Sequence, residues 1–200
     1  MTRSSTALIL TTVLLCFLCG TTVRSQSSQV VYLKDTPDRL VHVYLGGGTA
    51  LPVSNLADQT NSGYTGTLGV GIIPTFLSSG DIEIVLRGQY DRLSGASSTR
   101  PDISFMSVGL DWKLNLAPRR STNWYLIAGG GFTRTAWHEF ENNGRTIPQI
   151  TESHLYGAGG MGIEFVRKSA SPYIEARLAN VTGPRMGNYY FFRIMAGLKI

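Results

Sequence analysis

Eight segments of alternating apolar and polar residues, with no helical period among them, are the feature that most constrains this chain. Successive side chains on a β-strand point to opposite faces, so such alternation favours strands. Residues typical of turns separate the segments, which favours antiparallel neighbours. The segments are residues 40–49, 64–77, 81–92, 103–116, 123–137, 154–166, 172–182 and 189–200.

The breaks between these segments alternate in length. The tight breaks are 78–81, 117–122 and 167–171, the long polar breaks are 50–63, 93–102 and 138–153, and 183–188 is intermediate. Short turns at one end and long loops at the other are typical of transmembrane barrels. The sequence therefore predicts an all-β fold over residues 40–200, an eight-stranded antiparallel up-and-down transmembrane β-barrel.

Alternation alone does not separate a membrane barrel from a soluble periplasmic barrel of the lipocalin kind, whose apolar side chains would point inward around a ligand. Four features favour lipid outside, two of them being the absence of cysteines after the leader and the apolar face of the final segment. The segments reach the length of about 9–11 residues that a tilted strand needs to span a membrane, and the loop lengths alternate. The soluble barrel stays the alternative fold.

The first 25 residues are predicted to be a signal peptide. A positively charged start precedes the apolar run 7–20, whose length fits an h-region and is too short for a spanning helix. Small residues place the cleavage between Ser25 and Gln26. Residues 26–39 are then a short periplasmic N-terminal segment.

Composition argues against several other classes of protein. Both cysteines lie inside the predicted leader, so the exported chain has no disulfide, cysteine nucleophile or thiolate metal site. The net charge of +5 is modest and no long basic run occurs, so we expect no nucleic-acid partner. No spacing of histidines and carboxylates suggests a metal site, and we expect no cofactor.

Glycine-aromatic motifs recur along the segments: HVYLGGGTALP (42–52), YTGTLGVG (64–71), WYLIAGGGF (124–132) and LYGAGGMGIEF (155–165). With the leader and the eight segments, they make residues 40–200 resemble the small eight-stranded outer-membrane barrels of Gram-negative bacteria, the group of the OmpA transmembrane domain and OmpX. The resemblance implies a protein of the cell outer membrane that contacts outer-membrane lipid and lipopolysaccharide. We expect a monomer.

The final segment resembles the signal by which barrel-assembly machinery recognises such proteins during biogenesis. Its outward apolar face would consist of Tyr190, Phe192, Ile194, Leu198 and Ile200. The family more often ends in phenylalanine, so the terminal isoleucine departs from the pattern.

If the apolar faces contact lipid, the opposite faces place five acidic and five basic side chains in the lumen. They are Glu83, Asp91, Asp111, Glu164, Glu175, Arg87, Lys113, Arg177, Arg193 and Lys199. An eight-stranded barrel is just wide enough for its side chains to fill it, and unpaired charges there would be costly. We expect a salt-bridged plug. A narrow, low-conductance, porin-like channel is the alternative.

Aromatic residues mark both ends of the segments, as in the interfacial girdles of membrane barrels. Those near the short turns are Trp112, Trp124, Phe76 and Phe165, and those toward the long loops are Tyr64, Tyr90, Phe132, Tyr190 and Phe192. The glycine clusters are predicted to leave room for long inward arginine or tyrosine side chains.

Polar residues at both roots of the third long loop raise the possibility of catalysis. They are His138, Glu139, Glu152, Ser153 and His154. A Ser–His–acid arrangement supports acyl transfer, and some outer-membrane barrels of this size are lipid A deacylases or acyltransferases. A rim lipid A or phospholipid hydrolase is therefore an alternative. We expect a protein without enzymatic activity that acts structurally or through its extracellular loops, by adhesion or by binding an unknown ligand.

Overall fold

The computed structural model describes residues 40–74, 81–97, 99–117, 120–142, 145–167, 169–183 and 187–200. The predicted signal peptide with its cleavage site, the segment 26–39 and Phe76 lie outside these residues. The chain divides into two compact units, Met1–Asp35 and Thr36–Ile200, and only the second contains described residues. In the described part, no helix has the length and apolar character needed to cross a membrane.

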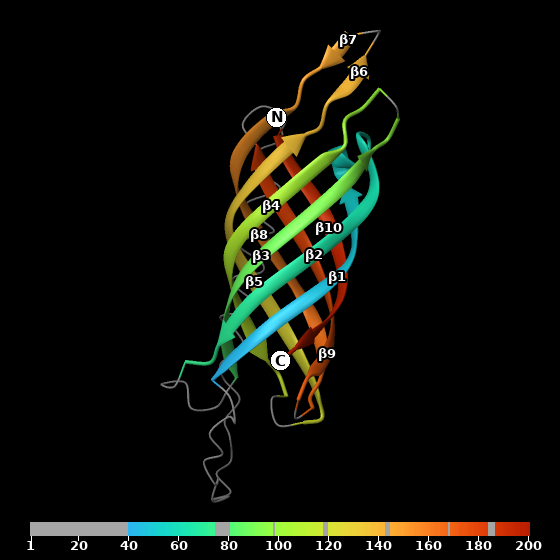
Figure 1. The fold of residues 1–200 in the computed structure, drawn as a ribbon. Helices are drawn as coiled ribbons and strands as arrows, with labels where there is room; N and C mark the ends of the chain where they lie inside the picture. The colour runs from blue at the N-terminus through green and yellow to red at the C-terminus, as the bar shows by residue number, and fades with distance from the viewer. Residues whose placement is uncertain are drawn as a thin grey trace, which may run out of the picture. The chain divides into compact units, whose positions relative to one another are not determined.

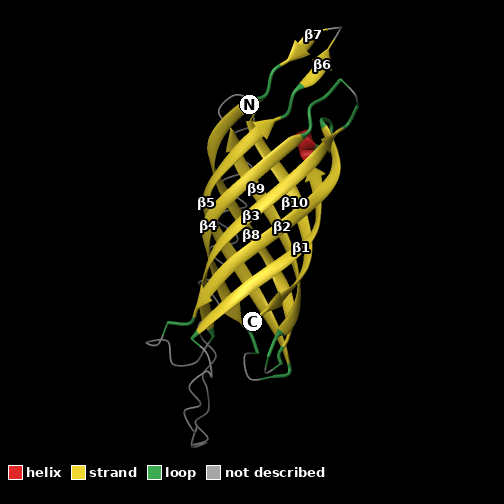
Figure 2. Cartoon of the chain, viewed as in Figure 1, coloured by secondary structure: helices red, strands yellow, loops and turns green. Residues whose placement is uncertain are grey.

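Eight long strands close into a barrel in the second unit (Figure 1, Figure 2). They are β1 (Val41–Val53), β2 (Thr60–Ile72), β3 (Ile82–Gly95), β4 (Ile103–Asn115), β5 (Thr122–Trp137), β8 (Ile150–Phe165), β9 (Ser171–Gly183) and β10 (Gly187–Lys199). Each pairs antiparallel with its neighbours in the order β1-β10-β9-β8-β5-β4-β3-β2. The predicted eight-stranded up-and-down barrel is therefore confirmed.

Two smaller elements lie at the loop end of the barrel. A 3-10 turn, η1 (Ser54–Leu56), follows β1. The short strands β6 (Phe140–Asn142) and β7 (Arg145–Ile147) form a hairpin in the loop between β5 and β8. This hairpin extends beyond the barrel wall at the top of the view in Figure 1.

The first and last strands close the wall. Their register runs from Tyr44 opposite Lys199 to Val53 opposite Tyr190. Val43 and Ile200 also exchange two backbone hydrogen bonds of 2.9 Å. The backbone of the final strand is therefore paired on both sides, with β1 and with β9.

The first strand is longer at the loop end than predicted. Residues 50–53, expected in a loop, continue β1, with Ala50 fully buried and Leu51 exposed. Beyond Ala50, β1 pairs with β10 but no longer with β2. One side of the strand there needs no ladder hydrogen bond, which explains how Pro52 is accommodated.

The wall is apolar outside. Large side chains on its outer face are largely exposed, for example Leu68 at 59 %, Leu110 at 54 % and Trp112 at 58 %. The inward positions on the same strands are buried and mostly polar, as Asp111 and Lys113 are. A lipocalin-like barrel would have the opposite arrangement, so that alternative is wrong.

Inward glycines give inward tyrosines their space. A Cβ atom at Gly109 would collide with the Tyr156 hydroxyl, and one at Gly162 would collide with the Tyr125 ring. Both tyrosine side chains are buried in the lumen. The close approach of side chain to backbone therefore requires glycine at these positions.

Candidate functional site

Two lysines and two glutamates fill the turn end of the lumen, and all four lie within two residues of a strand end. Lys113 Nζ is 2.6 Å from Glu164 Oε2 and 3.6 Å from Glu83 Oε2. Lys199 Nζ is 3.2 Å from Glu164 Oε1 and 3.3 Å from Glu83 Oε2. His42 Nδ1 adds a contact of 3.0 Å to Glu83 Oε1. Each carboxylate thus has at least two cationic or hydrogen-bonding partners.

A second cluster lies in the middle of the lumen. Arg177 donates to both oxygens of Asp111, at 2.9 and 2.7 Å. Arg87 Nε lies 2.9 Å from Asp111 Oδ2, and its Nη1 donates to Glu175 Oε1 at 2.8 Å. The Tyr125 hydroxyl donates to Glu175 Oε2 at 3.1 Å. Bidentate arginine–carboxylate pairs of this kind are among the stronger ion pairs in proteins.

A third pair lies closer to the long loops. Arg193 donates to both oxygens of Asp91, at 3.0 and 2.6 Å. All ten charged side chains that alternation assigns to the lumen are found there, five acids and five bases, and the most exposed of them, Lys199, is 13 % exposed. The arrangement is one of mutual neutralisation.

An apolar layer that was not predicted from the alternation closes the lumen above these charges. Leu56 of η1, Phe105 and Phe191 are all fully buried. The two phenylalanine rings stack with their centroids 5.0 Å apart, and Tyr189 packs edge-on against Phe105 at 6.3 Å. The Arg193 guanidinium lies 4.6 Å from the Phe191 ring centroid, so the charged and apolar layers are in direct contact.

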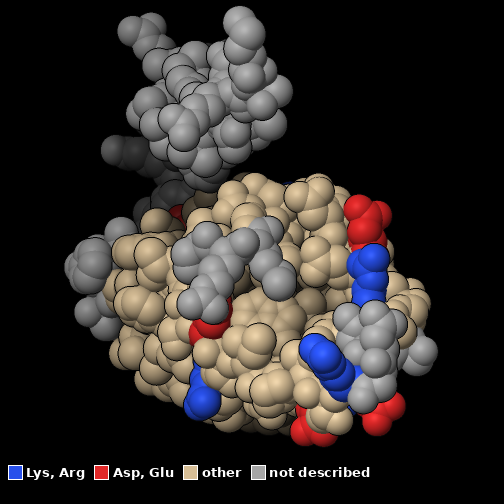
Figure 3. All heavy atoms as spheres, turned by 90° about the horizontal axis from the view of Figure 1, so that it is seen from above, with Lys and Arg blue, Asp and Glu red and all other residues tan. Residues whose placement is uncertain are grey.

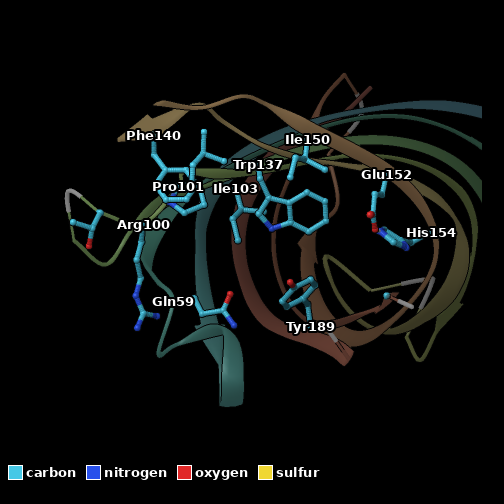
Figure 4. Close-up of a pocket in the computed structure, with 13 residues that line it drawn as sticks. Gln59, Arg100, Pro101, Ile103, Trp137, Phe140, Ile150, Glu152, His154 and Tyr189 are labelled. Atoms are coloured by element: carbon cyan, nitrogen blue, oxygen red, sulfur yellow. The ribbon is translucent and has the colours of Figure 1, made fainter. Parts of the chain in front are cut away.

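A pocket of about 680 Å³ opens at the loop end, next to the apolar layer (Figure 4). Ile103, Trp137 and Tyr189 belong both to the apolar layer and to the pocket lining. The pocket was also not predicted. Its residues come from strand ends and loops that are far apart in the sequence, including Gln59 and Phe140.

The acidic and basic side chains of the pocket that the structure describes lie at its two ends. Glu152 and His154 point toward one another on one side, and Arg100 lies on the opposite side with Trp137 between them (Figure 4). His154 Nε2 is 3.5 Å from Glu152 Oε2, and the two side chains are 2 % and 20 % exposed. Arg100 is exposed and donates to the backbone carbonyl of Asp58.

Of the residues of the predicted Ser–His–acid alternative, the structure brings Glu152 and His154 together but not the serine. Ser153 and His154 are adjacent on β8 and therefore face opposite sides, Ser153 exposed on the outer wall and His154 buried inside. His138 Nε2 instead lies 3.1 Å from Ser104 Oγ. In the described part of the chain, no hydrogen bond joins Ser153 to either histidine, and Glu139 is exposed.

The predicted interfacial aromatics that the structure describes lie on the outer face. Six of them are at least 39 % exposed and Tyr190 and Phe192 are half-buried, the six being Trp112, Trp124, Phe165, Tyr64, Tyr90 and Phe132. The exposed Ile194, Leu198 and Ile200 continue the outer face of the final strand. Their roles as girdles and as an insertion signal stay predictions.

The loop between β3 and β4 is fixed by one carboxylate. Asp102 Oδ2 accepts a hydrogen bond from Arg92 Nη2 at 2.9 Å, and Oδ1 accepts one from the Gly95 amide at 2.9 Å. The hydrogen bond from the Gly95 amide, followed by the contact with Arg92, lowers the pKa of Asp102 below its ordinary value.

Among the described residues, no group of three or more His, Cys, Asp and Glu side chains could hold a metal ion.

An eight-stranded barrel with an apolar wall and a filled, charge-paired interior defines the class of small outer-membrane-type β-barrels. The structure of Neisserial surface protein A (NspA) shares this fold with a TM-score of 0.61 and 14 % sequence identity, over 81 % of this chain and 97 % of that one. Ail, the attachment invasion locus protein of Yersinia pestis, gives a TM-score of 0.51 and 14 % identity, over 81 % of this chain and 100 % of that one. No protein-family model matches the chain, and no curated protein matches it either. The likeness therefore concerns the fold, and at that level the predicted resemblance is confirmed.

Proposed function

We propose that this protein is an integral barrel of the bacterial outer membrane that binds a ligand at its loop end, with a lumen that does not conduct and without enzymatic activity. The apolar outer wall supports the membrane assignment. Soluble monomers rarely expose contiguous apolar patches larger than a few hundred Å², whereas here the outward positions of all eight strands carry exposed large apolar side chains.

The observation that carries the proposal is a pocket lying over a filled lumen. Its volume of about 680 Å³ lies within the range of about 300–1,000 Å³ that is usual for ligand sites. Beneath the pocket, the apolar layer and the paired charges fill the lumen, so we expect no path for solutes. Ail is an attachment invasion locus protein by its name, which agrees with a role exercised at the cell surface.

Lipid contacts are part of the same proposal. Arg134 is exposed on the outer wall toward the loop end, between Met106 and Ser153 in the sheet register. Among the described residues it forms no ion pair. A guanidinium in this position suits the phosphates of lipopolysaccharide or phospholipid. We also propose that the final strand is recognised by the barrel-assembly machinery.

Conductance measurements test the closed lumen. We expect the purified protein in a planar bilayer to show no discrete conductance steps, because five acids and five bases are paired inside a barrel that an apolar layer caps. Heat-modifiable migration on a detergent gel verifies that the inserted protein is folded. Discrete steps from the folded protein would contradict the proposal and favour the narrow channel.

Fluorescence tests the pocket. The chain has three tryptophans, and Trp112 and Trp124 lie on the outer wall. The variant Trp112→Phe/Trp124→Phe therefore leaves Trp137 as the sole reporter. We expect small amphipathic probes to change Trp137 emission in a saturable way. A response that only rises linearly with probe concentration would indicate partition into detergent and would count against ligand binding.

A further inference from the structure

We propose that the loop-end pocket selects amphipathic organic cations, that is, compact apolar groups carrying a single ammonium. The inference rests on the proposed function, since it presumes that the pocket binds ligands, and it adds the chemical class that the pocket takes.

The walls of the pocket favour an apolar body. Ile103, Ile147 and Ile150 line it together with Pro101 and Phe140. These side chains offer no hydrogen bond to a ligand. A ligand with polar groups spread over its surface would leave most of them unpaired, which is unfavourable in a partly dry site. The middle of the ligand must therefore be apolar.

The floor of the pocket favours a cation. The Trp137 and Tyr189 rings lie next to each other at its centre (Figure 4) and are 8 % and 1 % exposed. The face of an aromatic ring attracts cations, and tryptophan does so most strongly. The attraction grows when water is excluded, as it is around these two buried side chains.

One end of the pocket supplies a matching negative charge. Glu152 is the one carboxylate among the described residues that line the pocket, and its side chain is 20 % exposed. The Nε2 atom of His154 lies 3.5 Å from the Oε2 atom of Glu152. Figure 4 shows this pair beside Trp137 and Tyr189. An ammonium group here would meet a carboxylate and an aromatic face together.

The opposite end carries Arg100, so an anionic ligand is the competing class. The exposure of the two charged side chains decides which of them acts more strongly on a ligand. Arg100 is an exposed residue whose guanidinium already donates to the carbonyl of Asp58, and exposed charges are strongly screened by water and salt. Glu152 is mostly buried, so its charge acts through a medium of lower effective dielectric. Seen from the loop end, acidic and basic side chains lie next to one another on the visible surface (Figure 3), so no patch of a single sign is visible there that would outweigh the charge of Glu152.

Three probes of similar shape test the inference in the Trp137 reporter variant. They are 2-phenylethylammonium, neutral 2-phenylethanol and anionic 3-phenylpropionate. We expect the cation to bind at least about fivefold more tightly than the neutral probe, as a cation–aromatic contact beside a carboxylate implies. The anion should bind most weakly.

Variants that remove one charge identify the side chain that causes the preference for the cation. Glu152→Gln keeps the shape of the side chain and should abolish the advantage of the cation. Glu139→Gln removes the same charge from the loop that follows β5, at an exposed residue that does not line the pocket, and should retain that advantage. Arg100→Gln should raise cation affinity by up to about twofold, because it removes a screened like charge. Heat-modifiable migration checks that each variant is folded.

The outcomes separate this inference from the proposed function. If the anion binds most tightly and Arg100→Gln weakens it, or if cation and neutral probe bind equally, the inference is overturned while ligand binding stands. If no probe gives a saturable response, the proposed function fails with it. Should Glu152→Gln not fold, the three probes on the reporter variant and on Arg100→Gln still decide the sign of the preferred charge.

Discussion

The interior of this barrel depends on side-chain volume as much as on charge. Tyr125 and Tyr156 fit in the lumen because nearby strands carry glycine where a Cβ atom would collide with them. Gly109 faces Tyr156 in this way, and the Tyr156 ring belongs to the apolar cluster that closes the lumen. A single methyl group at the wrong position should therefore disturb the packing of that cluster.

Gly109→Ala is expected to destabilise the barrel by about 2 kcal/mol, since overpacking a filled interior costs about 1–3 kcal/mol. The added Cβ would collide with the Tyr156 hydroxyl and with the Gly130 backbone. Gly66→Ala is the matched control, because a Cβ there meets no atom within 4 Å. Denaturant unfolding of both variants measures the difference, and equal stabilities would contradict this account.

Residue chemistry also explains which parts of the site could be predicted. The ten charged side chains were assignable to the lumen because a charge facing lipid is costly. Aromatic and aliphatic residues fit either side of the wall, so the layer of Phe105 and Phe191 was not predicted. The inward position of Trp137 could have been predicted from the sequence. Counted from the outward Phe132, the alternation places Trp137 inside the barrel. The same count separates Ser153 from His154, which the predicted catalytic alternative overlooked.

Among the elements, the long loops differ most from their sequence-based description. Residues 50–63 contain strand ends and the turn η1, which places Leu56 fully buried in the lumen. Leu56 packs against residues of distant strands, and no local pattern encodes such a contact. The strand centres, by contrast, follow the alternation closely, because every position there faces either the outer wall or the filled lumen.

The β3–β4 loop should respond to acid through Asp102. The pKa of this carboxyl is lowered in the folded protein, so its stabilising contacts are fully present above its unfolded pKa of about 3.9. They are lost as the pH falls through the lower, folded value. We expect the NMR shift of the Gly95 amide, which donates to Asp102, to titrate with a midpoint below about 3.9.

Asp102→Asn supplies the control for that titration. The amide side chain can still accept the hydrogen bond from Gly95 but does not titrate, so the Gly95 shift should lose this pH-dependent step. A midpoint at or above the ordinary aspartate value in the unmodified protein would show that the carboxylate contacts do not stabilise the loop.

The whole molecule inverts the usual distribution of polarity. Ten charged side chains are paired within the barrel, and the outward positions of its strands carry large apolar side chains. In water such a wall would favour aggregation, whereas in a bilayer the same wall is solvated by lipid and the backbone hydrogen bonds are satisfied by closure. The alternating loop lengths and the closed strand order are both consistent with a barrel whose outer wall contacts lipid.

The substitution Leu110→Arg tests directly whether the outer wall contacts lipid. Leu110 lies in the middle of β4, is 54 % exposed, and is flanked by Leu86 and Gly130 in the sheet. An arginine facing lipid at the bilayer midplane costs about 2–4 kcal/mol, whereas an exposed substitution in water usually changes stability by less than about 0.5 kcal/mol. We therefore expect a loss of about 2–4 kcal/mol in the free energy of folding into lipid vesicles. Glu139→Arg, at an exposed loop residue, should fold with nearly unchanged free energy. If both variants fold equally well, the outer wall does not face lipid and the membrane assignment is wrong.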